Sequence, residues 1–214
     1  MQVLTDNLDL FVLGFTNTGI MFVISAVFAL LLGSVIGILR ISPSAPMRAV
    51  GTVYVNTLRN TPLALLMMFF ALGYPKLGLP ALDYFTLATV ALVLYTASYV
   101  AEVFRSGVNS IDKGQTEAAR AIGLSFGQVM WVVLLPQAFR NVVPPLMSVF
   151  IAALKNTTVA SGFSVMQAGA ISANMSERGE NLLVTLLWVA LFFFILVMGL
   201  AALQRKFERK WAQS

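Results

Sequence analysis

The 214-residue sequence predicts an all-α integral membrane protein with five transmembrane helices. Its composition points there first, because 58% of the residues are hydrophobic and only 11% are charged, whereas a soluble domain carries about 25% charged residues. Long stretches also lack charge, and a helix needs roughly 20 apolar residues to cross the hydrocarbon core of a bilayer. Finally, the few charged residues fall between these stretches. The whole chain, residues 1–214, is expected to form one transmembrane domain.

The first three spans follow from uncharged runs. No charged residue lies between Asp9 and Arg40, which places the first span at residues 18–39. The second span is placed at residues 61–79, where an early proline suits the first turn of a helix. The third span is placed at residues 84–104. The start of the chain is acidic and has no basic region, so no cleavable signal peptide is expected.

The fourth and fifth spans come from the C-terminal half. The fourth is placed at residues 136–154, where two consecutive prolines are expected to break the regular helix. Lys155 ends this run and would lie inside the outer half of the membrane. Residues 157–175 are rich in Gly, Ala and Ser, which indicates a re-entrant or interfacial segment. The fifth span, at residues 181–203, is the cleanest.

The distribution of charge predicts the orientation. Basic residues of membrane proteins concentrate in short cytoplasmic loops. Here they follow the first, third and fifth predicted spans, while the opposite side is net acidic. The N-terminus is therefore expected outside and the C-terminus in the cytoplasm. Because this topology explains the net charge of +5, no nucleic-acid partner is expected.

The residue types that are missing exclude most catalytic chemistry. The sequence has no histidine and no cysteine, which rules out Cys/His zinc sites, thiolate nucleophiles and Ser-His-Asp triads. Without clustered carboxylates, an embedded enzyme is a weak alternative. A passive channel is another, but no filter sequence supports it. The pair Gly33-x-x-x-Gly37 suits close helix packing within this fold better than a dedicated dimer seam.

Residues 105–130 form the longest hydrophilic connection. Asp112 and Thr116 are candidate helix starts, and Gly123 is a natural stop. Isolated helices shorter than roughly 12 residues are marginal in water. This short helix is therefore expected to dock against a partner, with Leu124 contributing an apolar contact.

The segment Glu117–Pro136 reads E-A-A, three residues, Gly123, nine residues, then V-x-L-P. It resembles the EAA motif of bacterial ABC importer permeases, whose pattern is E-A-A-x3-G-x9-I-x-L-P. The stretches at 54–63, 101–107 and 154–158 match the polar amino-acid subfamily. From about residue 16 onward the chain resembles in particular the glutamate-uptake permeases of actinobacteria.

This resemblance implies the type I ABC importer permease fold and a multi-pass position in the bacterial cytoplasmic membrane. The short helix would then couple the chain to an ATPase through Glu117, Ala118, Ala119, Gly123, Leu124 and Pro136. The implied partners are two cytoplasmic ABC ATPase subunits, a second permease chain that is identical or homologous, an extracytoplasmic amino-acid-binding protein and the lipid bilayer. The chain lacks a phosphate-binding G-x-x-x-x-G-K-[ST] loop, so ATP and Mg are expected on the ATPase subunits and no cofactor is expected here.

Polar residues inside a span are costly and usually functional, which makes Lys155 the main candidate for binding a substrate carboxylate. Alternatively, Lys155 extends outward or pairs with Glu177 or Glu180. The candidate substrate-binding residues are Lys155, Asn156, Thr157, Thr158, Asn60 and Thr61. The last two have an alternative role as a helix cap beside a proline.

The resulting hypothesis is a permease subunit that moves a polar amino acid into the cell, with glutamate the first choice. Glutamine, aspartate or a basic amino acid are the alternatives. The chain is not expected to be an enzyme, because partner subunits would hydrolyse ATP.

Overall fold

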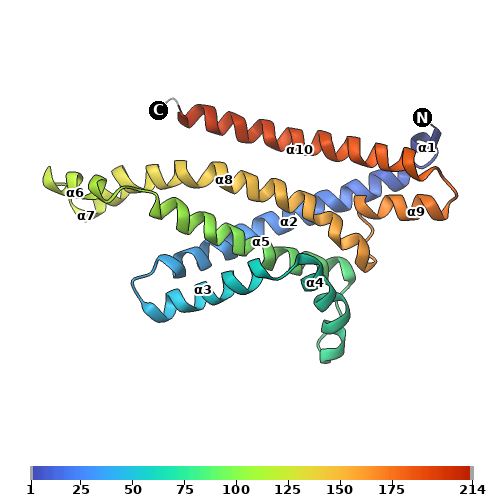
Figure 1. Ribbon diagram of the computed structural model, residues 1–214, viewed down its shortest axis with the longest axis horizontal. Coiled ribbons are helices and arrows are strands. Elements are labelled where there is room, and N and C mark those ends of the chain that lie inside the picture. The colour runs from blue at the N-terminus through green and yellow to red at the C-terminus, as the bar shows by residue number, and fades with distance from the viewer. Residues whose placement is uncertain (1, 213–214) are drawn as a thin grey trace.

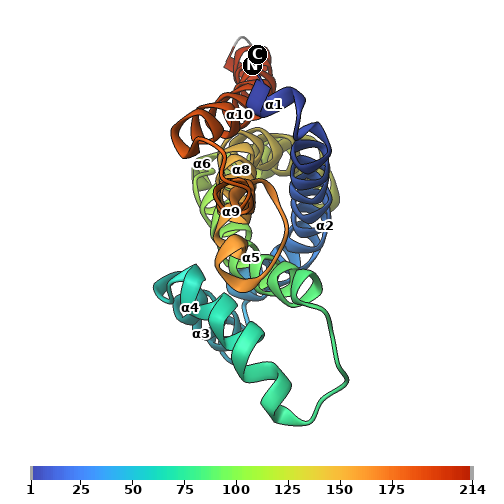
Figure 2. The ribbon, with the colours of Figure 1, turned by 90° about the vertical axis from the view of Figure 1, so that its right-hand side faces the viewer.

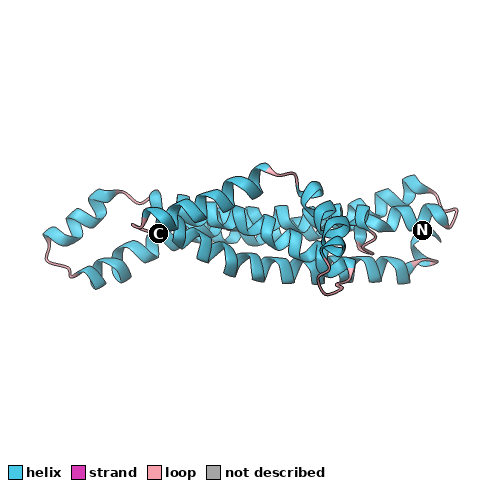
Figure 3. Cartoon of the chain, turned by 90° about the horizontal axis from the view of Figure 1, so that it is seen from below, coloured by secondary structure: helices cyan, strands magenta, loops and turns pink. Residues whose placement is uncertain are grey.

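The computed structural model describes residues 2–212, and the side chains of all of these except residues 2, 126 and 210–212. Every regular element among the described residues is helical, which confirms the all-α class. Long helices lie side by side along the long axis of the molecule (Figures 1 and 3): α2 (Leu8–Ile41), α5 (Tyr84–Asn109), α8 (Leu135–Asn156) and α10 (Leu182–Ala212). The elongated bundle suits a membrane protein.

Short helices occupy the two ends of the bundle. Near the N-terminus lie α1 (Gln2–Thr5), the 3-10 turns η4 (Thr157–Phe163) and η5 (Ala168–Ala170), and α9 (Ile171–Glu177). Near the C-terminus lie α6 (Lys113–Ala121), α7 (Phe126–Gln128) and the π-helical turn η3 (Val129–Leu134) (Figure 1). The charge pattern places this second end in the cytoplasm.

Four described helices are long and apolar enough to cross a membrane, and a bent helix pair brings the number to five. The four are Leu8–Ile41, Tyr84–Asn109, Val129–Phe163 and Leu182–Arg209. The predicted first, third and fourth spans lie inside these helices, and the predicted fifth begins one residue before the last of them. The chain is therefore an integral membrane protein.

The second predicted span, residues 61–79, differs from the structure. The chain first forms α3 (Ala45–Asn60) in what was predicted as a loop, and then bends by 98°. Thr61 is extended at the bend (φ −94°, ψ 128°), because a residue before proline is disfavoured in the helical region. After it come α4 (Leu63–Met68), the π-helical turn η1 (Phe69–Gly73) and the 3-10 turn η2 (Tyr74–Leu77), which project from the bundle (Figure 2).

The expected break at Pro144 and Pro145 is also wrong, since α8 continues through both residues. Each proline removes one backbone N–H, which frees the carbonyls of Arg140 and Asn141. Both of those residues are exposed, so their carbonyls do not require an internal donor. The helix therefore extends from η3 to η4 as one path of 35 residues.

Two glycines bring α2 and α5 together. A Cβ on Gly33 would lie 2.5 Å from Cβ of Val100, and one on Gly37 would lie 2.9 Å from Cβ of Phe104. Only glycine permits backbones to approach this closely. The Gly33/Gly37 pair thus packs within the chain, as its Gly-x-x-x-Gly spacing predicted.

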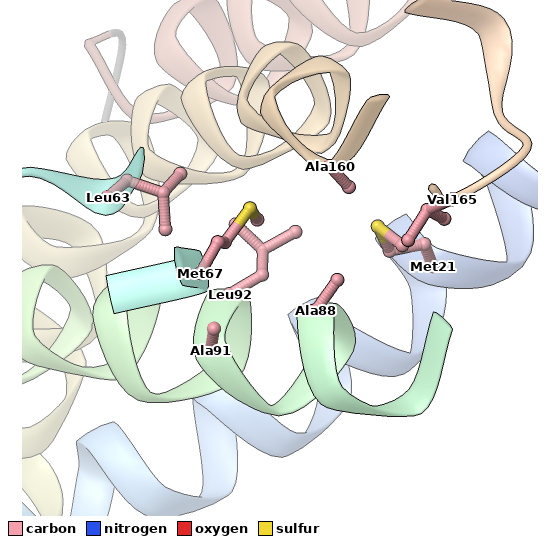
Figure 4. Close-up of a cluster of buried hydrophobic side chains, with 8 residues drawn as sticks. All are labelled: Met21, Leu63, Met67, Ala88, Ala91, Leu92, Ala160 and Val165. Atoms are coloured by element: carbon pink, nitrogen blue, oxygen red, sulfur yellow. The ribbon is translucent and has the colours of Figure 1, made fainter. Parts of the chain in front are cut away.

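The segment from residue 157 to 175 folds back across the outer end of α2. The backbone N–H of Ala168 donates to the Thr18 hydroxyl (3.0 Å), and the Asn17 amide donates to the carbonyl of Met166 (2.7 Å). A buried apolar cluster joins this segment to α2, α4 and α5 (Figure 4), and its members are Met21, Leu63, Met67, Ala88, Ala91, Leu92, Ala160 and Val165. The predicted re-entrant segment is therefore a packed part of the fold.

Candidate functional site

A cluster of charged side chains joins three helices in the cytoplasmic half of the bundle. Glu102 of α5 accepts hydrogen bonds from Arg40 of α2 and from Arg105, whose Nη2 lies 2.5 Å from Oε1. Nη1 of Arg59, from α3, lies 3.7 Å from Oε2 of the same carboxylate. From the sequence alone, the spacing of three residues between Glu102 and Arg105 predicts only this local pair. In the structure, three cations surround one anion.

Arg59 also contacts an aromatic pair. Its guanidinium carbon lies 5.1 Å from the centroid of the Tyr99 ring, within the range of a cation–π interaction. The Tyr99 hydroxyl in turn lies 2.9 Å from the hydroxyl of Tyr95, one helical turn away. The Tyr99 side chain thus links the charged cluster to the hydroxyl of Tyr95 on the same helix.

Two hollows lie along the seam where α5 packs against α8. The first, of about 300 Å³, is lined by Tyr95, Thr96, Tyr99, Ser148, Val149, Ala152, Ala153 and Asn156. The second, of about 600 Å³, is lined by Arg59, Tyr99, Glu102, Val103, Ser106, Gly107, Ser110, Asn141, Pro145 and Val149. We call them the outer and the inner hollow, because the inner one contains the residues nearest the predicted cytoplasmic end.

The two helices that form this seam are antiparallel and meet closely at their cytoplasmic ends. A Cβ on Gly107 would overlap the side chain of Val142, which shows how near the backbones come. One turn further, the Asn141 amide donates to the Ser110 hydroxyl (2.9 Å). These contacts hold the seam and leave the hollows open to one side of it.

One residue that lines the outer hollow, Thr96, carries an unsatisfied polar group. Thr96 is only 2% exposed, and its hydroxyl has no hydrogen-bond partner within the described part of the chain. A buried polar atom without a partner costs free energy, so such atoms mark strained or functional places. Together with the amide of Asn156 and the two tyrosine hydroxyls, it makes the outer hollow suitable for a small polar molecule.

The predicted substrate-binding residues near the end of α8 have different environments. Asn156 lines the outer hollow, whereas Lys155 is exposed and forms no ion pair with any described residue. The hydroxyls of Thr157 and Thr158 donate to the carbonyls of Leu154 (2.7 Å) and Lys155 (2.8 Å). Thr157 is fully buried and lines neither hollow, and the oxygen of Thr158 has only acceptor capacity left for a ligand.

Asn60 and Thr61 lie elsewhere, at the bend between α3 and α4. Thr61 donates to the carbonyl of Thr57 (2.8 Å), and α4 has no side-chain cap, so neither of the two residues caps the helix. Thr61 lines a separate hollow of about 570 Å³ with Lys76. The structure does not bring this pair to the same hollow as Asn156.

The short helix predicted in the 105–130 connection is α6. The Asp112 carboxylate accepts from the N–H of Gly114 (2.9 Å), as an N-cap does. At the other end Gly123 has φ +88°, and the N–H of Leu124 donates to the carbonyl of Ala119 (3.2 Å). This bond, with the one from Gly123 to Arg120 (3.0 Å), forms a Schellman motif.

The faces of α6 differ. Ala119 is buried, while Glu117 and Ala118 are exposed. One exposed apolar side chain beside this helix was not singled out in the sequence: Ile122 is 79% exposed and lies outside the candidate membrane spans. Apolar groups outside the lipid zone mark interaction surfaces. α6 and its surroundings therefore present a surface suited to a protein partner.

Sequence reasoning also missed the polar face of α5. Tyr95, Tyr99, Glu102 and Ser106 are spaced by four, three and four residues, so they share one face of a helix. A polar stripe of this kind on an otherwise apolar span was the available signal. What the stripe faces could not be predicted, because that depends on the position of α3 and α8.

The chain is similar over nearly its full length to proteins of one family. The profile of the binding-protein-dependent transport system inner membrane component family matches residues 11–213. A relative from Bacillus subtilis, the probable glutamine ABC transporter permease protein GlnM, is 35% identical, covering 99% of each chain. The glutamate transport system permease protein GluC of Corynebacterium efficiens is 37% identical, covering 89% of each chain.

Solved structures agree with the observed fold. A crystal structure of an amino acid ABC transporter with histidines superposes with a TM-score of 0.90 at 26% identity, covering 97% of this chain and 96% of the other. An inward-facing structure of the MetNI methionine ABC transporter gives 0.72 at 20% identity, covering 94% and 97%. The second likeness concerns the fold alone.

Proposed function

The chain belongs to the binding-protein-dependent transport system inner membrane component family, and from this premise we propose that it is the permease subunit through which glutamate enters the cell. It is a subunit of an amino-acid ABC importer and not an enzyme, since its relatives are permease proteins of ABC transporters. The membrane is proposed to be the bacterial cytoplasmic membrane.

The choice of glutamate depends on one observation, the excess of positive charge beside the hollows. Three guanidinium groups surround the single carboxylate of Glu102, and Arg59 lines the inner hollow itself. Charge of one sign in a cleft with low-dielectric walls attracts the opposite charge. An amino acid with a second carboxylate is therefore favoured over glutamine, and a basic one is disfavoured. Similarity to glutamate permeases such as GluC supports the same choice.

Binding is proposed in the outer hollow and at the end of α8. Asn156 and the unpartnered hydroxyl of Thr96 would hold polar groups of the amino acid. The ammonium of Lys155, adjacent in sequence, would attract a carboxylate, and Thr158 would contribute an acceptor, whereas the fully buried Thr157 would not contact the ligand. Asn60 and Thr61 are a less central part of this proposal, because the bend separates them from Asn156.

The energy would come from partners. Two cytoplasmic ATPase subunits are proposed to bind ATP and Mg and to dock on α6 and its surroundings through Glu117, Ala118, Gly123, Leu124 and Pro136, with the buried Ala119 supporting this surface. A second permease chain, identical or homologous, would close the open side of the hollows. An extracytoplasmic amino-acid-binding protein would deliver the substrate to the opposite end.

A competition experiment tests the substrate. The importer is reconstituted with its ATPase and binding protein, and uptake of labelled glutamate is measured with an excess of unlabelled glutamate, aspartate, glutamine, arginine or histidine. We expect glutamate and then aspartate to suppress uptake most. If glutamine or arginine suppresses it as strongly as glutamate, the charge argument is wrong.

A further inference from the structure

The two hollows of the α5–α8 seam share two lining residues. Tyr99 of α5 and Val149 of α8 belong to both, whereas every other lining residue belongs to one hollow alone. In an antiparallel pair of helices, residues that line two successive spaces lie at the boundary between them. Tyr99 and Val149 therefore separate the outer hollow from the inner hollow.

Small residues line each hollow beside this boundary, together with larger ones such as Tyr95 and Glu102. The outer hollow contains Ala152 and Ala153, and the inner one contains Ser106 and Gly107. The boundary itself is formed by a phenol ring and a branched aliphatic side chain. Hollows thus lie on both sides of the boundary formed by Tyr99 and Val149.

The Tyr99 ring at this boundary is held from two sides. Its hydroxyl pairs with Tyr95 at 2.9 Å, and the Arg59 guanidinium lies over its face at 5.1 Å. Arg59 is 39% exposed and has one carboxylate neighbour among the described residues, Glu102 at 3.7 Å. Holding a long, partly exposed side chain in one position costs side-chain entropy, which contacts with fixed partners must offset. Glu102 is itself fixed by Arg40 and Arg105.

We propose that Tyr99 and Val149 form a gate in the path of the amino acid, and that Glu102 is a positioning residue that keeps Arg59 against the Tyr99 ring. The gate rests on the proposed import function, because it divides the same path into an outer, substrate-holding part and an inner part open toward the cytoplasm. Opening requires the Tyr99 ring to leave the face of Arg59, and any movement of α3 relative to α5 separates the two.

The chain has no cysteine, so single reporter cysteines can be introduced on both sides of the gate. Ser106→Cys reports on the inner hollow and Ala152→Cys on the outer one. In inside-out vesicles that hold the complete importer without nucleotide, a small membrane-impermeant methanethiosulfonate reagent is added at the cytoplasmic face. We expect rapid labelling at position 106 and slow labelling at position 152.

Removing the ring should open the route. We expect Tyr99→Ala to accelerate labelling of Ala152→Cys by about tenfold or more, equal to about 1.4 kcal/mol on the barrier, and to leave Ser106→Cys unchanged. Tyr84→Ala, on the same helix but outside both hollows, is the matched control and should change neither rate. If Tyr99→Ala does not accumulate in the membrane, Val149→Ala tests the facing wall with the same expectation.

The positioning role has its own test. Glu102→Gln should accelerate labelling at position 152 because it releases Arg59, and Glu102→Asp should restore the slow rate. Equal rates at the two positions in the parent, no acceleration in Tyr99→Ala, or equal acceleration at both positions would each overturn the gate. Because labelling needs no substrate, these outcomes are independent of whether glutamate is the amino acid transported.

Discussion

Replacing Gly33 with alanine tests the close approach of α2 and α5. The added Cβ would lie 2.5 Å from Cβ of Val100 and 2.7 Å from the carbonyl oxygen of Ala97. Carbon atoms in ordinary contact are about 3.5 to 4.0 Å apart, so the two helices must separate locally by roughly 1 Å. The backbone oxygen cannot rotate away as a flexible side chain can. The strain therefore disturbs the packing of α2 against α5 along their whole contact.

The matched control lies on the same helix. At Gly19 no atom lies within 4 Å of an added Cβ, so Gly19→Ala gains helix propensity and meets nothing. That gain is about 1 kcal/mol, and it applies equally to Gly33→Ala. The difference between the two variants is then the overpacking cost alone, typically about 1 to 3 kcal/mol.

Thermal unfolding of the solubilised complex, followed by the monodisperse peak in size-exclusion chromatography, measures this difference. A cost of about 2 kcal/mol corresponds to a midpoint about 4 to 8 °C lower for Gly33→Ala than for Gly19→Ala, taking a domain of about 200 residues. Equal midpoints for the two variants would refute the close approach at Gly33.

Three further substitutions test the coupling surface and the substrate site. Glu117→Lys reverses an exposed charge on α6, and it should reduce co-purification of the ATPase while the amount of permease in the membrane stays constant. Lys155→Ala should lower glutamate uptake about tenfold or more with the ATPase still bound, because a lost charge-assisted hydrogen bond costs roughly 1.5 to 3 kcal/mol. Lys76→Ala is the control. Equal uptake by the two variants would show that the substrate carboxylate binds elsewhere. Gly123→Ala puts a Cβ on a residue with φ +88°, so it should destabilise the end of α6 by about 1 to 2 kcal/mol and reduce substrate-stimulated ATPase activity. In the control Gly127→Ala the added Cβ meets no other atom, and the activity should stay near that of the parent. Loss of activity in both variants would contradict the role of the Schellman motif.

The apolar spans and the capped helix α6 could be predicted because both are set by local sequence. The absence of charge between Asp9 and Arg40 specifies a membrane helix wherever its neighbours lie. Asp112 and Gly123 similarly specify the two ends of α6 through bonds to their own backbone neighbourhood. Such features need no knowledge of tertiary contacts.

The bend before α4 and the continuity of α8 were harder to predict, because a proline can either end a helix or lie within one. Thr61-Pro62 ends one helix and begins another at 98°, whereas Pro144 and Pro145 lie within a helix. Thr61 has an extended backbone in the first case, whereas in the second the two residues four positions before the prolines, Arg140 and Asn141, are exposed. Neither property can be seen in the sequence.

The charge cluster depends on distant residues, and this explains why only one of its pairs was predicted. Glu102 and Arg105 are three positions apart on one helix, a spacing that indicates contact. Arg40 and Arg59 reach the same carboxylate from 62 and 43 positions away, and their arrival depends on how α2 and α3 pack. No periodicity within α5 contains that information.

The Gly33/Gly37 pair and the charge cluster act together, because both involve the same face of α2. Gly33, Gly37 and Arg40 are spaced by four and three residues, so the approach permitted by the two glycines brings the third residue to Glu102. Charges withdrawn from water are costly unless they are paired with good geometry. A shift of α2 that separates Arg40 from Glu102 would leave the largely buried guanidinium of Arg40 without its carboxylate, whereas Glu102 would keep Arg105 and Arg59. The cluster thus fixes the register of α2 against α5 while leaving α3, whose Arg59 lies further from the carboxylate, as the helix that can move with least cost.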